Sequence, residues 1–163
     1  MTDVASVVMR SPVGPLFIVA SPAGVTSIEF SDGRAVARSA AGADPSAGRH
    51  VEAAALQLDE YFAGRRRAFD LVLDLRGTAF QVLAWQALVR IPFGATVTYG
   101  EQAAMIGRPT AARAVGSANG RNPVPIVVPC HRVLAAGRAL GGYSSGLDVK
   151  RALLALEGVS VAG

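Results

Sequence analysis

The 163-residue sequence predicts an α+β protein with two domains: a small β-sheet domain with one helix over residues 1–76, and a mainly helical domain over residues 77–163. Three observations predict this division. Segments rich in β-forming residues fill the first thirty positions, helical patterns dominate after residue 78, and positive charge is concentrated in the second half. A hydrophobic content of 51% with 17% charged residues is typical of a globular protein with a sizeable core.

Three predicted strands open the chain. The segments SVVMRS, PLFIVAS and GVTSIEF are rich in β-branched and aromatic residues, and PVG and PAG between them are turn sequences. Small residues over 39–48 predict a loop. Residues 49–64 then predict a helix that ends at Gly64, with an apolar face made of Val51, Ala54, Ala55, Leu58, Tyr61 and Phe62.

The predicted domain boundary lies near Arg76 and Gly77. Before it, residues 69–75 alternate Phe and Leu with Asp and Val, which predicts a half-buried strand. After it, Thr78 is placed to cap a helix over residues 79–91, whose apolar stripe contains Phe80, Leu83, Ala84, Ala87, Leu88 and Ile91.

Two short helices are predicted next. Thr98 followed by Glu101 is a capping-box sequence, which predicts a helix over residues 99–107. Gly and Pro then interrupt the pattern, and residues 111–120 predict a second helix. Two short helices joined by a tight turn are typical of a helix-turn-helix, although an ordinary two-helix hairpin fits the same spacing. A last helix is predicted over residues 147–158.

The charge is unevenly distributed. Residues 1–76 contain 8 Arg and 9 acidic residues, a net charge of −1. Residues 77–163 contain 7 Arg and one Lys against three acids, a net charge of +5. Such an asymmetry favours a polyanion such as nucleic acid as the partner of the second half, while a solvated Arg-rich surface is the alternative interpretation.

Cys130, in the segment IVVPCHRVLAAG, is the only cysteine in the chain. A single cysteine excludes an internal disulfide, and with only two histidines it argues against a structural zinc site, so neither a metal nor a cofactor is expected. Without a signal-peptide pattern or an apolar run long enough to span a membrane, we expect a cytoplasmic protein without membrane contact.

A reactive Cys130 needs a base and a stabilised thiolate. His131 is the obvious base, but neighbouring residues of a strand point to opposite faces, so a direct contact requires a turn at this point. Pro129 suits the start of such a turn. The residues alone leave a buried packing side chain and a nucleophile both open.

The segment PCHRV, residues 129–133, resembles the acceptor motif of the O6-alkylguanine-DNA alkyltransferase family. The segments TAFQVLAWQAL, IPFGATVTYGEQAAMIG, AARAVGSANGRNPVPI and GGYSSGLDVKRALLALEG also match family blocks in the same order, covering residues 78–158. The resemblance implies an RNase H-like first domain and a winged-helix-like helix-turn-helix in the second. It further implies DNA repair by a protein that transfers the alkyl group from O6-alkylguanine, and less readily from O4-alkylthymine, to its own cysteine once.

The resemblance implies a role for each matching residue. Cys130 would accept the alkyl group, His131 would take the thiol proton through a water, and Glu157 would orient His131. Asn122 would act as a hinge that holds the cysteine loop. Tyr99 would help to rotate the nucleotide out of the duplex and protonate the departing guanine.

Further residues would bind DNA or the modified base. Arg113 would insert where the base was, and four small residues would let the second short helix approach the minor groove of double-stranded DNA: Ala112, Ala114, Gly116 and Ala118. The pocket for the alkylguanine would be formed by Tyr143, Ser144, Ser145 and Val133. Ser145 replaces a glycine that is common in the family, which predicts a stiffer loop and a narrower pocket.

Three other functions fit the sequence less well. A non-catalytic sensor of alkylated DNA lacks the cysteine that this chain has. A cysteine hydrolase or redox enzyme leaves the helix-turn-helix unexplained, and a transcription regulator needs base-reading side chains that the small residues do not provide. We expect a monomer, and cooperative assembly on DNA stays open.

Overall fold

The computed structural model describes residues 3–31 and 44–161. The chain divides into two compact units, Met1–Arg76 and Gly77–Gly163. The first holds a β-sheet with one helix and the second is mainly helical, so the α+β prediction is confirmed.

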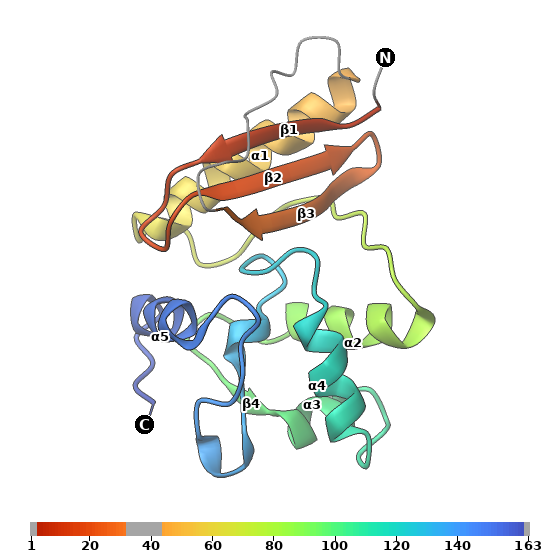
Figure 1. The fold of residues 1–163 in the computed structure, drawn as a ribbon, viewed down its shortest axis with the longest axis vertical. Helices are drawn as coiled ribbons and strands as arrows, with labels where there is room; N and C mark the ends of the chain where they lie inside the picture. Colours follow the sequence, from red (N-terminus) through yellow and green to blue (C-terminus); the bar gives the residue numbers. More distant parts are fainter. Residues whose placement is uncertain (1–2, 32–43, 162–163) are drawn as a thin grey trace. The chain divides into compact units, whose positions relative to one another are not determined.

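The first unit contains an antiparallel sheet in the order β1-β2-β3 (Figure 1). Its strands are β1 (Ala5–Met9), β2 (Leu16–Ser21) and β3 (Gly24–Phe30), which confirms the three predicted strands. Alternate side chains of β2, those of Leu16, Ile18 and Ala20, are fully buried. The period of two in the sequence therefore marks the face of the sheet that the core covers.

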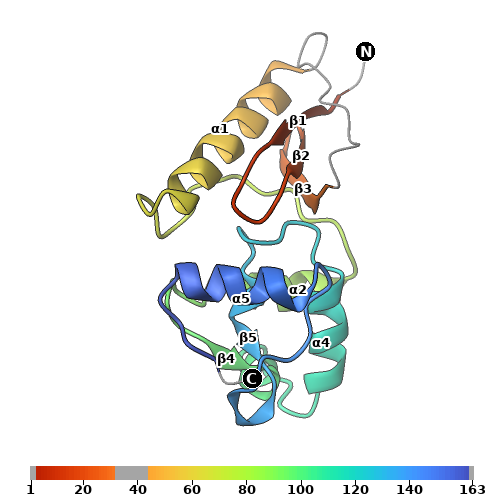
Figure 2. The same ribbon diagram turned by 60° about the vertical axis from the view of Figure 1, so that its left-hand side comes forward.

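Helix α1 (Pro45–Phe62) packs against this sheet, as Figures 1 and 2 show. The predicted start at residue 49 is wrong, as is the loop predicted over residues 45–48. Asp44 accepts hydrogen bonds from the backbone N–H groups of Ser46 and Ala47, and Pro45 occupies the first helical position. Both are strong start signals that begin the helix one turn earlier than the apolar pattern indicated. The other predicted loop residues, 39–43, lie outside the described residues.

The strand predicted over residues 69–75 is also wrong. Only Leu73 forms a bridge, a single parallel one with Val25 of β3. The backbone of Asp70 is bound instead by the side chain of Gln57 on α1: its N–H donates to Oε1 at 2.8 Å and its carbonyl accepts from Nε2 at 3.0 Å. A side chain therefore satisfies backbone groups that a strand would have paired.

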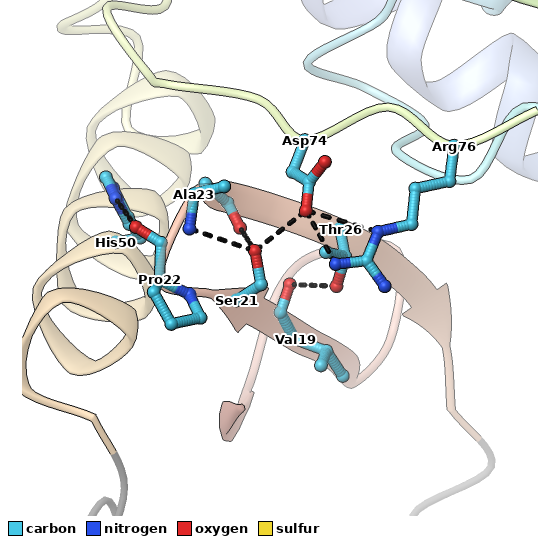
Figure 3. A network of polar contacts seen from close by, with 9 residues as sticks. Val19, Ser21, Pro22, Ala23, Thr26, His50, Asp74 and Arg76 are labelled. Carbon is cyan, nitrogen blue, oxygen red and sulfur yellow. Dashed lines mark hydrogen bonds and ion pairs between the residues drawn. The ribbon is translucent and has the colours of Figure 1, made fainter. Parts of the chain in front are cut away.

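A polar network attaches the end of this segment to the sheet (Figure 3). Asp74 Oδ2 accepts hydrogen bonds from Ser21 Oγ at 2.8 Å and from Arg76 Nη2 at 2.7 Å. Ser21 Oγ in turn accepts from the N–H of Ala23 at 3.1 Å. The hydrogen bonds from Arg76 and then Ser21 hold the pKa of the Asp74 carboxyl below its ordinary value.

The second unit contains four helices, two 3₁₀ turns and one pair of short parallel strands within its described residues. These are α2 (Ala79–Val89), β4 (Val97–Thr98), α3 (Tyr99–Met105), α4 (Ala112–Gly120), η1 (Cys130–Arg132), β5 (Val133–Leu134), η2 (Ala136–Arg138) and α5 (Leu147–Leu156). All four helices were predicted, with ends that differ by one or two residues.

Both predicted caps are confirmed, and each forms a complete capping box: Thr78 with Gln81 on α2, and Thr98 with Glu101 on α3. In each box the threonine hydroxyl oxygen accepts a hydrogen bond from the backbone N–H of the residue three positions later. The side chain of that later residue accepts a hydrogen bond from the backbone N–H of the threonine. Two otherwise unpaired N–H groups are satisfied at each helix start.

Helices α3 and α4 form the predicted helix-turn-helix and pack against α2. The side-chain amides of Gln102 and Asn119 form two mutual hydrogen bonds, at 3.0 and 2.7 Å, between α3 and α4. Gln102 also donates to the carbonyl of Ala84 on α2, and Trp85 Nε1 donates to the carbonyl of Ala118 at 2.8 Å. These buried hydrogen bonds set the relative position of the three helices.

Across residues 3–31 and 44–161, none of the helices combines the length and the apolar character needed to cross a membrane.

Candidate active site around Cys130

Cys130 begins the 3₁₀ turn η1, so the turn that a Cys–His site requires is present. The loop before it is held by Asn122, whose Nδ2 donates to the carbonyl of Val128 at 2.7 Å and whose Oδ1 accepts from the N–H of Val124 at 3.0 Å. Within this loop Ile126 is fully buried and has a φ of 75°, a strained value for a β-branched residue. Asn122 and the core thus enforce an unfavourable backbone conformation next to the cysteine.

Cys130 is buried, with 7% of the residue exposed. Burial raises its pKa above the ordinary value, and four weaker effects oppose this: a hydrogen bond with Asn122, the charge of Lys150, a hydrogen bond with Tyr143, and the backbone N–H of Cys130 itself. The net direction is upward. At neutral pH the resting group is therefore a thiol, which needs a base to become a nucleophile.

His131 is a buried base coupled to a carboxylate. Its Nε2 lies 2.6 Å from Oε2 of Glu157. Burial lowers the pKa of His131 although Glu157 opposes this, so the imidazole is neutral at pH 7. An ionised Glu157 assigns the ring proton to Nε2 and leaves the lone pair on Nδ1, a buried atom that has no hydrogen-bond partner among the described residues.

Glu157 is anchored from several sides. Arg132 Nε donates to Oε1 at 2.8 Å and Arg132 Nη2 donates to Oε2 at 3.1 Å, while Arg132 Nη1 donates to the carbonyl of Ile91 at 2.6 Å. The N–H of Gly94 also approaches Oε1, at 3.4 Å. Glu157 follows the C-terminus of α5, where the helix dipole disfavours an acid, and the guanidinium offsets this. Sequence reasoning missed Arg132, although an acid at a helix C-terminus signals the need for a cation.

A cavity of about 320 Å³ opens onto Cys130. Its wall includes five of the residues predicted from the resemblance, which come from the two helix-turn-helix helices, the cysteine turn and the loop before α5: Tyr99, Gly116, Cys130, Tyr143 and Ser144. The lining is completed by Gly142, one of the glycines beside Tyr143 that the resemblance also places in the pocket loop, and by Asn119 and Gly120, which sequence reasoning missed. The size is suited to a small planar ligand.

Two predicted pocket residues are corrected. Val133 does not line this cavity: its side chain is fully buried, and its place in β5, paired with Val97, turns the side chain into the core. Ser145 is half-buried and is also absent from the lining, so the narrower pocket predicted from it does not arise by contact with this cavity.

Tyr99, the first residue of α3, lies between two glycines. A Cβ atom at Gly116 would lie 3.6 Å from its ring, and one at Gly141 would lie 3.4 Å from it. The backbone N–H of Gly142 donates to the Tyr99 hydroxyl, but burial dominates and raises the pKa of Tyr99. The phenol is therefore protonated at neutral pH and able to donate a proton.

The outer face of α4 carries Arg113 and Ala114, both exposed. Ala112 and Arg113 line a second hollow of about 500 Å³, which shares Tyr99 and Gly116 with the first. The prediction that Ala118 faces the DNA is wrong, because this residue is 3% exposed and belongs to the core. It lies three residues after the buried Val115, on the face of α4 that packs against α2 and α3.

The cations of Gly77–Gly163 fall into two groups. Six arginines are exposed: Arg90, Arg108, Arg113, Arg121, Arg138 and Arg151. The other two cations, Arg132 and Lys150, are buried beside Cys130 and its base. In residues 3–31 and 44–161, no three His, Cys, Asp or Glu side chains gather closely enough to hold a metal ion.

Comparisons with known proteins agree with this geometry. Residues 79–159 match the model of the 6-O-methylguanine DNA methyltransferase DNA binding domain, and residues 6–75 match that of the ribonuclease-like domain of the same proteins. The chain is 48% identical to a methylated-DNA–protein-cysteine methyltransferase of Mycobacterium leprae over 91% of this chain and 89% of that protein. It is 44% identical to one of Methanosarcina acetivorans over 93% and 96%.

The fold is similar to the crystal structure of Mycobacterium tuberculosis OGT in complex with DNA, with a TM-score of 0.81 and 44% identity over 94% of this chain and 92% of that chain. Two family models cover nearly the whole sequence, and the two relatives, at 48% and 44% identity, align over 91% and 93% of it. The chain therefore belongs to the 6-O-methylguanine DNA methyltransferase family.

Proposed function

We propose that this protein repairs DNA by moving an alkyl group from O6 of an alkylated guanine in duplex DNA to Sγ of Cys130, once per molecule. The observation that carries the proposal is the single buried thiol that lines a cavity, next to a neutral histidine held by a carboxylate. A thioether is stable in water, so the acceptor is not regenerated.

The path of the protons follows from the neutral resting states of the Cys130 thiol and the His131 imidazole. The Cys130 proton passes through a bound water to Nδ1 of His131, whose Nε2 donates to Glu157 and so stabilises the imidazolium. Sγ attacks the alkyl carbon opposite the C–O bond, so an S–C bond forms as the C–O bond breaks. The C–O electron pair leaves with guanine, which takes a proton from the Tyr99 hydroxyl.

The alkylated guanine has to leave the base stack to reach Sγ. We assign this step to Tyr99 and Arg113, which both line the 500 Å³ hollow. The planar guanidinium of Arg113 fills the space left in the duplex. Ala112, Ala114 and Gly116 let α4 approach the minor groove, and Tyr143 and Ser144 contact the extruded base in the cavity.

Residues 77–163 are proposed to hold both the DNA-binding and the acceptor functions, because their net charge is +5 and the cavity lies within them. We place the protein in the cytoplasm, where a free thiol remains reduced. Asn122 is proposed to keep the loop before Cys130 in its strained conformation.

The test is mass spectrometry of the protein after incubation with duplex DNA that contains O6-methylguanine. One added methyl group on the peptide that contains Cys130, with unmodified guanine restored in the DNA, is the expected result. Cys130→Ser is the control and should gain no methyl group. A folded wild-type protein with a free thiol that binds this DNA without gaining a methyl group would instead support a damage sensor.

A further inference from the structure

Arg138 adopts a left-handed backbone conformation in an exposed turn. Its φ is 61°, and within residues 3–31 and 44–161 the only other residue besides glycine with a positive φ is Ile126. Ile126 is fully buried in the core, whereas residues 136–139 are all exposed. Packing therefore enforces the strained backbone of Ile126 but not that of Arg138.

The backbone of this turn favours glycine at position 138. The N–H of Ala135 donates to the carbonyl of Ala139 at 2.9 Å, so residues 136–138 form a three-residue loop between paired backbone groups. The last residue of such a loop is usually left-handed, a conformation that glycine adopts without the steric cost of a Cβ atom. Arginine therefore stands here against the preference of the backbone.

The contacts of the Arg138 side chain within the protein are long and exposed. Nη1 donates to Thr96 Oγ1 at 3.4 Å, and Nη2 lies 3.5 Å from Oε1 of Glu101. The side chains of Arg138 and Glu101 are 57% and 51% exposed, and Oε1 already accepts from the N–H of Thr98 at 2.8 Å. An exposed ion pair of this length contributes little to stability, so these contacts do not explain an arginine in a strained position.

Arg138 lies next to two segments that line the 500 Å³ hollow. Ala135 and Ala136 of its own turn form part of the wall, and residues 98–100 at the start of α3 form another part. Among the described residues that line this hollow, Arg113 carries the one charged side chain. Because phosphates border both edges of a minor groove, a duplex placed against α4 brings phosphates to the residues around the hollow.

We propose that Arg138 binds a backbone phosphate of duplex DNA, and that it exchanges its ion pair with Glu101 for this phosphate when the DNA binds. The proposal rests on the proposed function, because it takes residues 77–163 as the DNA-binding unit. A hydrogen-bonded guanidinium–phosphate pair is stronger than the long, exposed contact with Glu101. Arg113 is assigned to the interior of the duplex, whereas Arg138 holds the backbone outside it.

The experiment compares Arg138→Gly, which removes the cation and suits the backbone, with Arg138→Lys, which keeps a cation and the strain. Arg151→Ala is the matched control, because it removes an exposed cation whose ion pair with Asp148 is also long, at 3.6 Å. Arg151 belongs to α5, none of whose described residues lines either cavity. Fluorescence anisotropy with an unmodified duplex measures affinity at several salt concentrations, and urea unfolding measures stability.

Arg138→Gly should weaken DNA binding about five- to tenfold at about 0.1 M salt. It should also reduce the slope of log affinity against log salt concentration by about 0.9, the effect of one lost phosphate contact. The same variant should unfold at a higher urea concentration than the wild type, because glycine relieves the strain. Arg138→Lys should keep the wild-type salt slope, and Arg151→Ala should bind within about twofold of the wild type, because salt screens a distant charge.

Three outcomes overturn the proposal. A wild-type salt slope in Arg138→Gly would mean that this side chain neutralises no phosphate, whatever the change in affinity. An equal loss of affinity in Arg138→Lys or in Arg151→Ala would show that the loss does not come from a cation at this position. A lower urea midpoint in Arg138→Gly, or its failure to fold, would assign Arg138 to the stability of the turn.

Glu101→Gln tests the exchange of partners. Gln81 forms the same capping box on α2, so glutamine at position 101 keeps the box and removes the charge. Affinity for the duplex should rise by about two- to fivefold, because Arg138 no longer has to leave an ion pair. Unchanged or lower affinity overturns the exchange.

Mass spectrometry of the wild-type protein keeps the two proposals apart. If the protein binds duplex DNA but gains no methyl group on Cys130, the proposed repair function is wrong. The salt slopes of the Arg138 variants, measured on unmodified DNA, still decide whether Arg138 binds a phosphate.

Discussion

At the scale of single residues, the site depends on ionisable groups that the fold removes from water. Burial raises the pKa of Cys130 and lowers that of His131, so both are neutral at rest. In the proposed mechanism, the proton moves from Cys130 to His131 only when the alkyl carbon is in place to accept the electron pair. A resting thiol also reacts more slowly with stray electrophiles than a permanent thiolate, which protects an acceptor that acts once.

The first prediction concerns His131 and pH. Because burial lowers its pKa in the folded state, the unfolded chain binds more protons as the pH falls below the ordinary value of about 6.5. The stability that this group contributes is present above that pH and is lost as the pH falls through the folded-state value. Urea unfolding of the wild type should therefore show a decrease in the free energy of unfolding from pH 7.5 to pH 5.5.

His131→Gln should flatten that pH dependence and slow methyl transfer by about a hundredfold or more, the usual cost of losing a general base. Measuring unfolding and single-turnover transfer on the same samples separates the two effects. A variant that loses stability with falling pH as steeply as the wild type would show that other groups cause the dependence.

At the scale of elements, the start of α3 links helix formation to chemistry. Thr98 caps the helix and Tyr99 is its first residue, so we expect the capping box to help fix the direction of the tyrosine ring. The Thr78 box on α2 has the same geometry, but no residue with a proposed catalytic role follows it. The two caps form a natural pair for comparison.

Thr98→Ala and Thr78→Ala should each lower the free energy of unfolding by about 1 kcal/mol, because each removes one N-cap hydrogen bond. Only Thr98→Ala should also slow methyl transfer, by severalfold. Chemical denaturation and single-turnover kinetics on both variants provide the check. Equal transfer rates in the two variants would mean that the position of Tyr99 does not depend on its cap.

At the scale of the whole molecule, the charged residues that favour DNA binding differ from those that lie beside the reacting groups. The exposed arginines of residues 77–163 provide the field that attracts DNA, whereas the buried cations Arg132 and Lys150 act on the reacting groups. Loss of the nucleophile should therefore leave DNA affinity intact.

Cys130→Ala should bind duplex DNA within about twofold of the wild-type affinity, and for both proteins the logarithm of the affinity should fall linearly with the logarithm of the salt concentration. Fluorescence anisotropy at several salt concentrations measures this. Loss of DNA binding in Cys130→Ala would contradict the separation of binding from chemistry.

Arg113→Ala should slow methyl transfer from duplex DNA more than methyl transfer from the free O6-methylguanine base, since only the duplex requires extrusion of the base.

The sequence by itself determined the features that depend on near neighbours in the chain. The three strands, the four C-terminal helices and both threonine caps follow from periodicity and from hydrogen bonds over three or four residues. The resemblance of PCHRV and its flanking segments determined the family. The prediction at residues 45–48 was wrong because the Asp44 cap is a stronger helix-start signal than the apolar pattern. The prediction at residues 69–75 was wrong because the side chain of Gln57, distant in sequence, forms hydrogen bonds with the backbone there.

The tertiary structure alone decided which groups lose contact with water and which meet. Ala118 and Val133 are buried rather than exposed to a ligand, and Arg132 and Lys150 become buried cations at the site. Lys150 and Val133 are 17 residues apart, and Arg132 and Glu157 are 25 apart. Pairings at such separations depend on how helices and turns pack, and no local pattern encodes burial of a charge, because its cost and its compensation come from residues distant in sequence.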